Sequence, residues 1–122
     1  WRVDLALAAD SLAFPVFEKA EELGIPVLVH QAGSTRVDAR MEYANPVLLD
    51  AAGRHFPDLR LIIAHCGIPW IDEALFMLTK HPNFYTEISY HIATVTREEL
   101  YRFFIHAKQF FVPLEKIFFG TD

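Results

Sequence analysis

The chain has 122 residues, of which 52% are hydrophobic, and its 11 Lys and Arg against 16 Asp and Glu give a net charge of −5. This length and apolar share predict one folded domain and exclude a disordered chain. The acidic balance argues against a nucleic-acid partner, and no apolar stretch reaches the ~18 residues that a membrane span needs. A single cysteine excludes a disulfide framework and a multi-cysteine zinc site, so we expect a reducing compartment, the cytoplasm.

The first residues, Trp1 to Asp4, contain neither an initiator methionine nor the pattern of a secretory signal. We therefore expect the chain to be a piece of a longer protein.

An amphipathic helical stretch, a proline and a short apolar run recur in that order along the chain. Proline suits the junction because it cannot continue a helix and is tolerated just ahead of a strand. The pattern predicts helices over 12–23, over 45–55, from Pro69 through Leu78, and from Thr96 through Phe110. The strands expected after them cover 27–30, 61–65, 84–88 and 117–120.

Capping residues support the first and last of these helices. Asp10 or Ser11 can cap the first helix, and Gly24 is suited to end it. Thr96 with Glu99 three residues later forms a capping box for the last helix.

The strands over 27–30 and 61–65 are continuous apolar runs, which is typical of parallel strands that are covered on both faces. The longer, more polar segment 31–44 is interpreted as a functional loop between a strand and a helix. Four helix–strand units fit either an open, doubly wound α/β sheet or half of a (βα)₈ TIM-type barrel.

Three polar residues stand at predicted strand ends: His30, His65 and Asp122. The alternation of side chains places His30 on the face of Leu28, and His65 on the face of Leu61 and Ile63. Two imidazoles and a carboxylate at one end of a barrel could surround a divalent metal ion. They could equally be hydrogen-bonded structural residues, and spacing alone leaves both interpretations open.

Three stretches of the chain resemble the amidohydrolase superfamily, in its amidohydrolase-related branch that includes aminocarboxymuconate-semialdehyde decarboxylase-like enzymes. Residues 20–30 are similar to that branch's passage from a helix into strand 5. Residues 57–67 resemble its strand 6, with the His-x-Gly ending, and 116–122 resemble its strand 8, with the Gly-Thr-Asp ending. The order of the three stretches agrees with the family.

The resemblance implies a (βα)₈ barrel that holds one divalent metal ion, most simply zinc. His30 corresponds to a metal ligand of the family. His65 corresponds to a catalytic histidine that positions the attacking water or binds substrate. Asp122 corresponds to an aspartate that both binds metal and handles the proton of the metal-activated water.

The chain departs from the family's pattern: it contains no His-x-His pair, which in the family ends strand 1 and supplies two ligands, and stretches resembling strands 1 to 4 are missing. We therefore interpret residues 1–122 as a partial metal-dependent hydrolase barrel, its strands 5 to 8. The open half should be inactive alone, should hold metal weakly, and should self-associate through apolar interior residues and unpaired edges.

For the whole protein we expect a hydrolase acting on an amide, ester or lactone of a small molecule, or a decarboxylase of a small acid at the same metal site. The alternative from another class is a non-catalytic open α/β binding module with structural histidines.

The remaining polar residues receive weaker assignments. Glu87, Tyr90 and His91 flank the third strand and could contact substrate, and Trp70 could line the pocket. Cys66 is expected to be a buried thiol. His55 and His81 are expected on the surface at helix ends, and His106 to be packed or half-exposed on the last helix.

Overall fold

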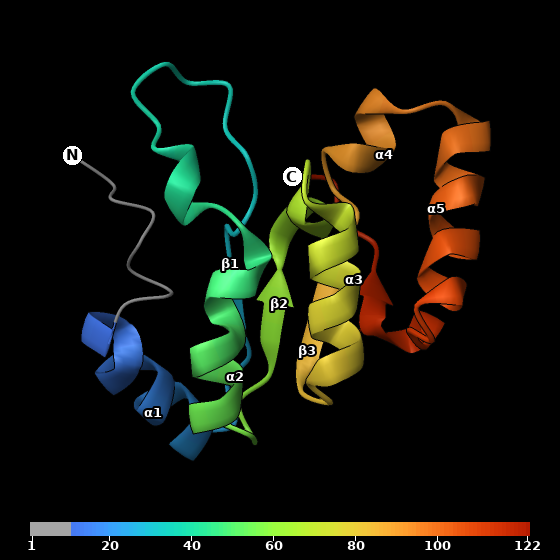
Figure 1. The fold of residues 1–122 in the computed structure, drawn as a ribbon. Helices are drawn as coiled ribbons and strands as arrows, with labels where there is room; N and C mark the ends of the chain where they lie inside the picture. The colour runs from blue at the N-terminus through green and yellow to red at the C-terminus, as the bar shows by residue number, and fades with distance from the viewer. Residues whose placement is uncertain (1–10) are drawn as a thin grey trace.

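A computed structural model of the chain describes residues 11–122, and in it four strands form one parallel sheet. The strands pair in chain order: β1 (Val27–Val29), β2 (Leu61–Ile63), β3 (Phe84–Glu87) and β4 (Ile117–Phe118). The helices between them lie against the sheet, with α2 and α3 in front of the strands in Figure 1. A doubly wound sheet would reverse its strand order at a switch point. The fold is therefore the predicted partial TIM barrel, and the open-sheet alternative is wrong.

The two faces of the sheet differ in exposure. On one face, Leu61, Ile63 and Phe84 are completely buried against the helices. On the other face lie Leu28, Ile62 and Tyr85, which pair across the sheet, and Phe118, which pairs with Glu87; Leu28 is 59% exposed. In a closed barrel this second face would line the interior. The helix side is consequently the packed core of this chain.

Four helices supply that core, because each places an apolar stripe on the sheet. They are α1 (Phe14–Glu22), α2 (Asp50–His55), α3 (Ile71–Lys80) and α5 (Arg97–Gln109). The buried side chains on them are Phe17, Ala20, Ala52, Ala74, Leu75, Met77, Leu78, Phe103 and Ala107. Full burial of one large apolar side chain stabilises the fold by about 1.5–3 kcal/mol. A short fifth helix, α4 (His91–Thr94), follows β3.

Most of the predicted helix ends agree with the structure. Thr96 and Glu99 form the capping box of α5, and Gly24 follows α1 with φ +64°, which glycine adopts without strain. The cap predicted for α1 does not form: its first flanking residue is Ala13, with no side-chain hydrogen bond, while Asp10 lies outside the described residues. The third helix begins at Ile71 and not at Pro69.

The second strand is shorter than predicted, because it ends at Ile63 and the chain then turns. The turn is a 3₁₀ segment, η5 (Ala64–Gly67), in which His65 and Cys66 both have φ +54°. Gly67 follows with φ +68°, and a Cβ atom there would lie 2.7 Å from the side chains of Ala74 and Pro46. The turn is held by packing of α3 and of the segment before α2, and it reorients the chain at the strand end.

His81 corrects another expectation, since its side chain is buried and not on the surface. Its ring stacks on Phe84, with 4.6 Å between ring centroids, and its Nε2 lies 2.8 Å from Asp50 Oδ1.

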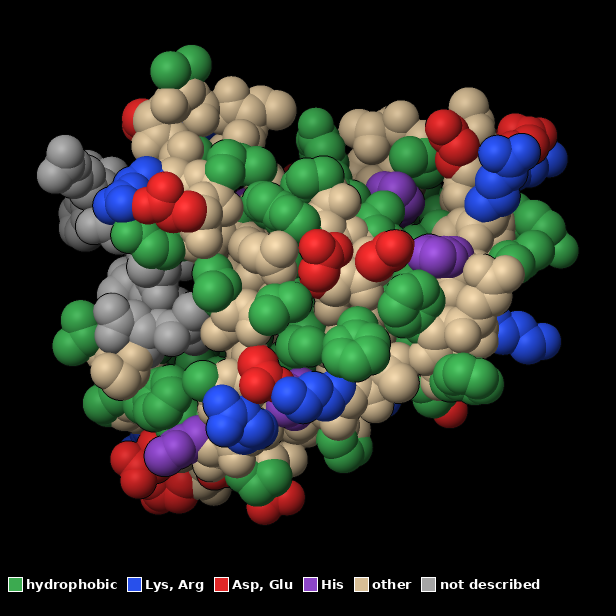
Figure 2. Space-filling model, in the orientation of Figure 1, with side chains coloured by type: hydrophobic (Ala, Val, Ile, Leu, Met, Phe, Trp, Pro, Cys, Tyr) green, Lys and Arg blue, Asp and Glu red, His purple; other side chains and the backbone are tan. Residues whose placement is uncertain are grey.

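The exposed helix side of the molecule mixes acidic and basic side chains without segregating them (Figure 2). Within residues 11–122, no helix is long and apolar enough to cross a bilayer.

Candidate functional site

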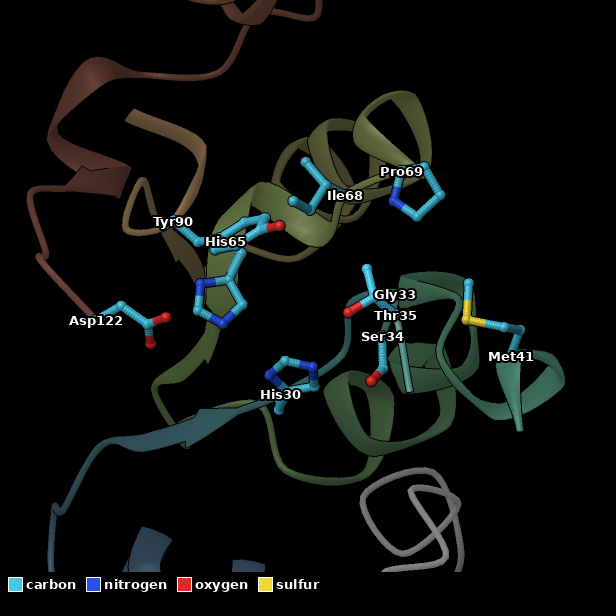
Figure 3. A pocket seen from close by; sticks show the side chains of 10 residues that line it. All are labelled: His30, Gly33, Ser34, Thr35, Met41, His65, Ile68, Pro69, Tyr90 and Asp122. Atoms are coloured by element: carbon cyan, nitrogen blue, oxygen red, sulfur yellow. The ribbon is translucent and has the colours of Figure 1, made fainter. Parts of the chain in front are cut away.

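Two adjoining cavities open at the carboxyl ends of the strands, with volumes of about 390 and 490 Å³. Both are lined by His30, His65 and Asp122, which follow β1, β2 and β4 respectively. Figure 3 shows the ring of His65 between Asp122 and His30. The structure thus brings together the three residues that the sequence places at separate strand ends.

His30 comes directly after β1, and its ring meets that of His65 edge to face. The ring centroids are 5.1 Å apart, with 69° between the planes. Burial lowers the pKa of His30, and neighbouring His65 lowers it further, while Asp122 opposes the change. His30 is therefore held toward its neutral form, which is the form that can bind a metal ion.

His65 reaches the cavity by a route that the sequence analysis did not anticipate. Strand alternation grouped His65 with Leu61 and Ile63, but both of those side chains face the helices. The left-handed backbone at His65 and Cys66 turns the histidine back toward the open face and sends the thiol into the core. The placement of His65 on the face of Leu61 and Ile63 was therefore wrong, and the position of its side chain is set by the turn.

Glu87 and Ser89 hold His65 from the end of β3. The backbone N–H of His65 donates to Glu87 Oε1 at 2.7 Å, and the backbone N–H of Ser89 donates to Glu87 Oε2 at 2.6 Å. His65 Nδ1 lies 2.9 Å from Ser89 Oγ and 3.4 Å from Glu87 Oε1. Burial on its own raises the pKa of Glu87, but the hydrogen bonds from Ser89 and His65 outweigh it and lower the pKa. Glu87 is consequently an ionised, buried carboxylate.

Gly120 allows β4 to approach this carboxylate closely. A Cβ atom at position 120 would lie 2.8 Å from Glu87 Oε2 and 3.3 Å from Ser89 Cβ. Glycine at position 120 thus permits a close approach of the backbone to Glu87. Asp122 follows two residues later at the rim of both cavities.

The long loop after β1 forms the second wall of the smaller cavity. Gln31 joins the beginning of this loop to its end, because its side-chain Nε2 donates to Tyr43 O at 2.6 Å and to Asn45 O at 3.1 Å. Gly33 N–H donates to Ile68 O at 2.6 Å, which joins the loop to the chain after β2. Ser34, Thr35 and Met41 from the loop, together with Ile68, Pro69 and Tyr90, complete the lining.

The donors of this site match a divalent metal ion in chemistry but do not complete a binding site. Imidazole nitrogen and carboxylate oxygen are ordinary zinc ligands, and structural or catalytic zinc needs at least three from the protein. Among residues 11–122, no three His, Cys, Asp or Glu side chains are grouped closely enough to hold an ion. His30 and Asp122 therefore fit as part of a ligand set.

The other predicted residues divide between the cavities and the core. Glu87 lines the larger cavity and Tyr90 the smaller one, whereas His91 packs on Phe103 and Trp70 lines neither. Ser89 was missed by the sequence analysis. The only signal for it was its spacing of two residues from Glu87, which indicates a shared side of the strand end.

A family model described as amidohydrolase matches residues 2–122. An uncharacterized TIM-barrel protein from Bordetella bronchiseptica is 26% identical, with a TM-score of 0.74 over 93% of this chain and 38% of that one. A protein from Lactobacillus casei that is described as a metal-dependent hydrolase is 25% identical, with a TM-score of 0.75 over 91% and 29%. No curated protein matches.

Dihydroorotase from Campylobacter jejuni shares the fold, at 23% identity and a TM-score of 0.57 over 92% of this chain and 38% of the enzyme. The chain thus spans 29–38% of the length of these structures. The match to the family model covers nearly every residue, and the neighbours have the same barrel. The chain belongs to the amidohydrolase family.

Proposed function

We propose that this chain supplies strands 5 to 8 of a mononuclear, zinc-dependent barrel enzyme of the cytoplasm that hydrolyses an amide, ester or lactone of a small molecule. The observation that carries the proposal is the meeting of His30, His65 and Asp122, from three different strand ends, at one pair of cavities. Structural histidines of a binding module would have no reason to converge with a carboxylate at the end where barrels keep their active sites.

Each of the three residues has a distinct proposed role. His30 and Asp122 hold the metal ion, together with ligands from the remaining half of the barrel. A divalent ion supplies Lewis acidity, which polarises a carbonyl and lowers the pKa of water. Asp122 takes the proton of the attacking water and returns it to the leaving group. His65 contacts the water or the substrate from the side opposite the loop.

The lining favours hydrolysis over decarboxylation of a small acid. The described residues that line the two cavities include no Lys or Arg, and Met41, Ile68 and Tyr90 make one wall largely apolar. A substrate with several carboxylates would need cations to compensate for its desolvation. A neutral acyl group fits this half of the site better.

The test is turnover by the parent protein that contains both halves of the barrel, loaded with zinc. It is assayed on neutral aryl esters, lactones and anilides, and on small unsaturated acids with release of carbon dioxide as the readout. We expect hydrolysis that falls at least 10²-fold in His65→Asn and Asp122→Asn. Release of carbon dioxide alone would assign the decarboxylase, and no turnover of either class would favour the binding module.

A further inference from the structure

His65 has its two ring nitrogens in different surroundings. Nδ1 faces the end of β3, where it lies 2.9 Å from Ser89 Oγ and 3.4 Å from Glu87 Oε1. The far edge of the ring points toward His30 and the cavity in Figure 3. The proton of a neutral imidazole sits on one nitrogen only, so its position decides what the ring can do in the cavity.

The buried carboxylate decides where that proton sits. An ionised carboxylate accepts hydrogen bonds and cannot donate one, so an unprotonated Nδ1 beside Glu87 would set a lone pair against a negative charge. Glu87 is 7% exposed, which leaves little water to screen that repulsion. A proton on Nδ1 removes the repulsion between the lone pair and the carboxylate, and the Nδ1–H group can donate to Ser89 Oγ.

Glu87 is also fixed in place independently of the ring. Its two oxygens accept the backbone N–H groups of His65 and Ser89, and the backbone at Gly120 passes close beside Oε2 because glycine has no Cβ atom there. The carboxylate of Glu87 therefore holds the backbone of His65 and also the backbone of Ser89, whose hydroxyl contacts the His65 ring. This arrangement goes beyond what packing of a structural histidine requires.

We propose that Glu87 and Ser89 are positioning residues that fix His65 in the tautomer with the proton on Nδ1, leaving Nε2 as a hydrogen-bond acceptor in the cavity. This inference deepens the proposed function and rests on it for its catalytic meaning. In neutral form, His65 then orients a water molecule by accepting its hydrogen bond, and does not donate to a substrate carbonyl. The role left open between water and substrate is thereby assigned to water.

The experiment is nuclear magnetic resonance of the 122-residue chain, with ¹⁵N-labelled histidine and with metal removed by a chelator. Long-range proton–nitrogen correlations at about pH 8, above the ordinary histidine pKa of about 6.5, distinguish a protonated from an unprotonated ring nitrogen. We expect Nδ1–H for His65 in the wild type. In the double variant Glu87→Gln, Ser89→Ala, the signal should change to the Nε2–H form that free histidine prefers.

Two further variants keep the test decisive. Ser89→Ala alone removes only the hydroxyl and should retain Nδ1–H, because Glu87 remains. Glu99→Gln is the matched control: Glu99 also accepts a backbone N–H and a hydroxyl, those of Thr96, but on α5, far from the site. It should leave the signals of His65 unchanged.

The outcomes separate this inference from the proposed function. Nε2–H in the wild type would overturn the assignment, and Nδ1–H that persists in the double variant would overturn the role of Glu87 and Ser89. If the double variant does not fold, the wild-type spectrum still decides the tautomer, and Glu87→Gln alone, which keeps the shape of the side chain and removes its charge, decides the role of Glu87. The measurement needs neither metal nor substrate. A parent protein without hydrolase activity would therefore contradict the proposed function but would not affect the tautomer assigned to His65.

Discussion

At the scale of single residues, Cys66 shows how one turn separates two neighbours into opposite environments. The thiol is 1% exposed and lies 3.5 Å from the backbone oxygen of Glu87, while His65 beside it faces the cavity. Burial raises the pKa of the Cys66 thiol to about 12, and the charge of Glu87 adds to the rise. Because the thiolate is the reactive form, Cys66 is a packing residue with no role in the chemistry.

We therefore predict that Cys66 resists alkylation in the folded protein. With iodoacetamide at pH 8, intact-mass measurement should show little modification over an hour, because less than about one thiol in a thousand is ionised at such a pKa and access is closed. The same protein in guanidinium should be modified completely. Rapid, stoichiometric labelling of the native chain would contradict the buried position.

The proposed ligand roles of His30 and Asp122 predict how the chain alone responds to zinc. With His30 and Asp122 as the available ligands, binding should be weak, and His30→Ala should lower the affinity by at least the roughly 10–100-fold that loss of outer ligand support costs. Titration calorimetry measures both. His106→Ala is the control, since His106 bonds Asp72 on the helix side. Tight stoichiometric binding, or equal loss in both variants, would count against the assigned ligands.

At the scale of secondary structure, a charged cluster joins α2 to the end of α3. Asp50 accepts from Arg54 Nε at 3.1 Å and from His81 Nε2, and it pairs with Lys80. Hydrogen bonds from Lys80 and His81 hold the pKa of Asp50 down at about 2. The cluster connects consecutive units at the end of the barrel opposite the site, and it is a stability element.

The expected effect of Asp50→Asn depends on pH. The pKa of Asp50 is lower in the folded state than in the unfolded one, so its contribution is present above about pH 4 and is lost as pH falls toward 2. The variant should be less stable by about 1 kcal/mol at pH 7, and the difference from the wild type should have shrunk to a small part of this at pH 2. Urea unfolding at both pH values checks this, with exposed Asp58→Asn as control. A difference independent of pH would rule out the ion pairs as its cause.

The sequence predicted the elements better than the turns between them. Prolines and the Thr96 capping box act locally, so four helices and four strands could be read without knowing the fold. The left-handed backbone at His65 and Cys66 could not, because neither residue favours it and the packing of Gly67 against α3 imposes it. Burial of His81 was likewise missed, since its partner Asp50 is distant in the chain.

The residues that line the cavities from three strand ends were predicted from the sequence, but a residue that holds one of them in place was missed. His30, His65 and Asp122 were found because residues at the ends of parallel strands meet at one edge of a sheet. Ser89 was overlooked because a serine after a strand is common, and its importance comes from contact with His65, which only the folded structure shows.

At the scale of the whole molecule, the helix side is packed and the opposite side of the sheet is apolar and open. This side carries the exposed Leu28 and Phe118 and the half-buried Ile62 and Tyr85, with Tyr85 and Phe118 stacked at 5.5 Å between centroids. Phe119 beside them is 72% exposed. Apolar patches of this kind associate in water, and within residues 11–122 β1 and β4 each have an unpaired edge.

We propose that the isolated chain self-associates through this face. Light scattering after size exclusion should show a dimer or larger species, and the paired substitution Leu28→Lys, Phe118→Glu should shift it toward monomer. Tyr101→Glu on α5 is the control, because Tyr101 is equally exposed but lies on a helix. A wild-type monomer, or an equal shift in the control, would refute the proposal.

The pairing of the strands in chain order also determines which backbone hydrogen bonds of the sheet break first in local unfolding. In the part of the chain that the structure describes, β2 and β3 each pair with a strand on both sides, whereas β1 and β4 pair with one. The backbone hydrogen bonds of β1 and β4 can therefore break while those between β2 and β3 persist. In deuterated water, the amides of Leu61 to Ile63 and Phe84 to Thr86 should exchange last, and those of β1 and β4 earlier. The stable centre of the molecule is thus the pair of strands that precede His65 and carry Glu87, whereas the proposed metal donors His30 and Asp122 follow the strands that open first.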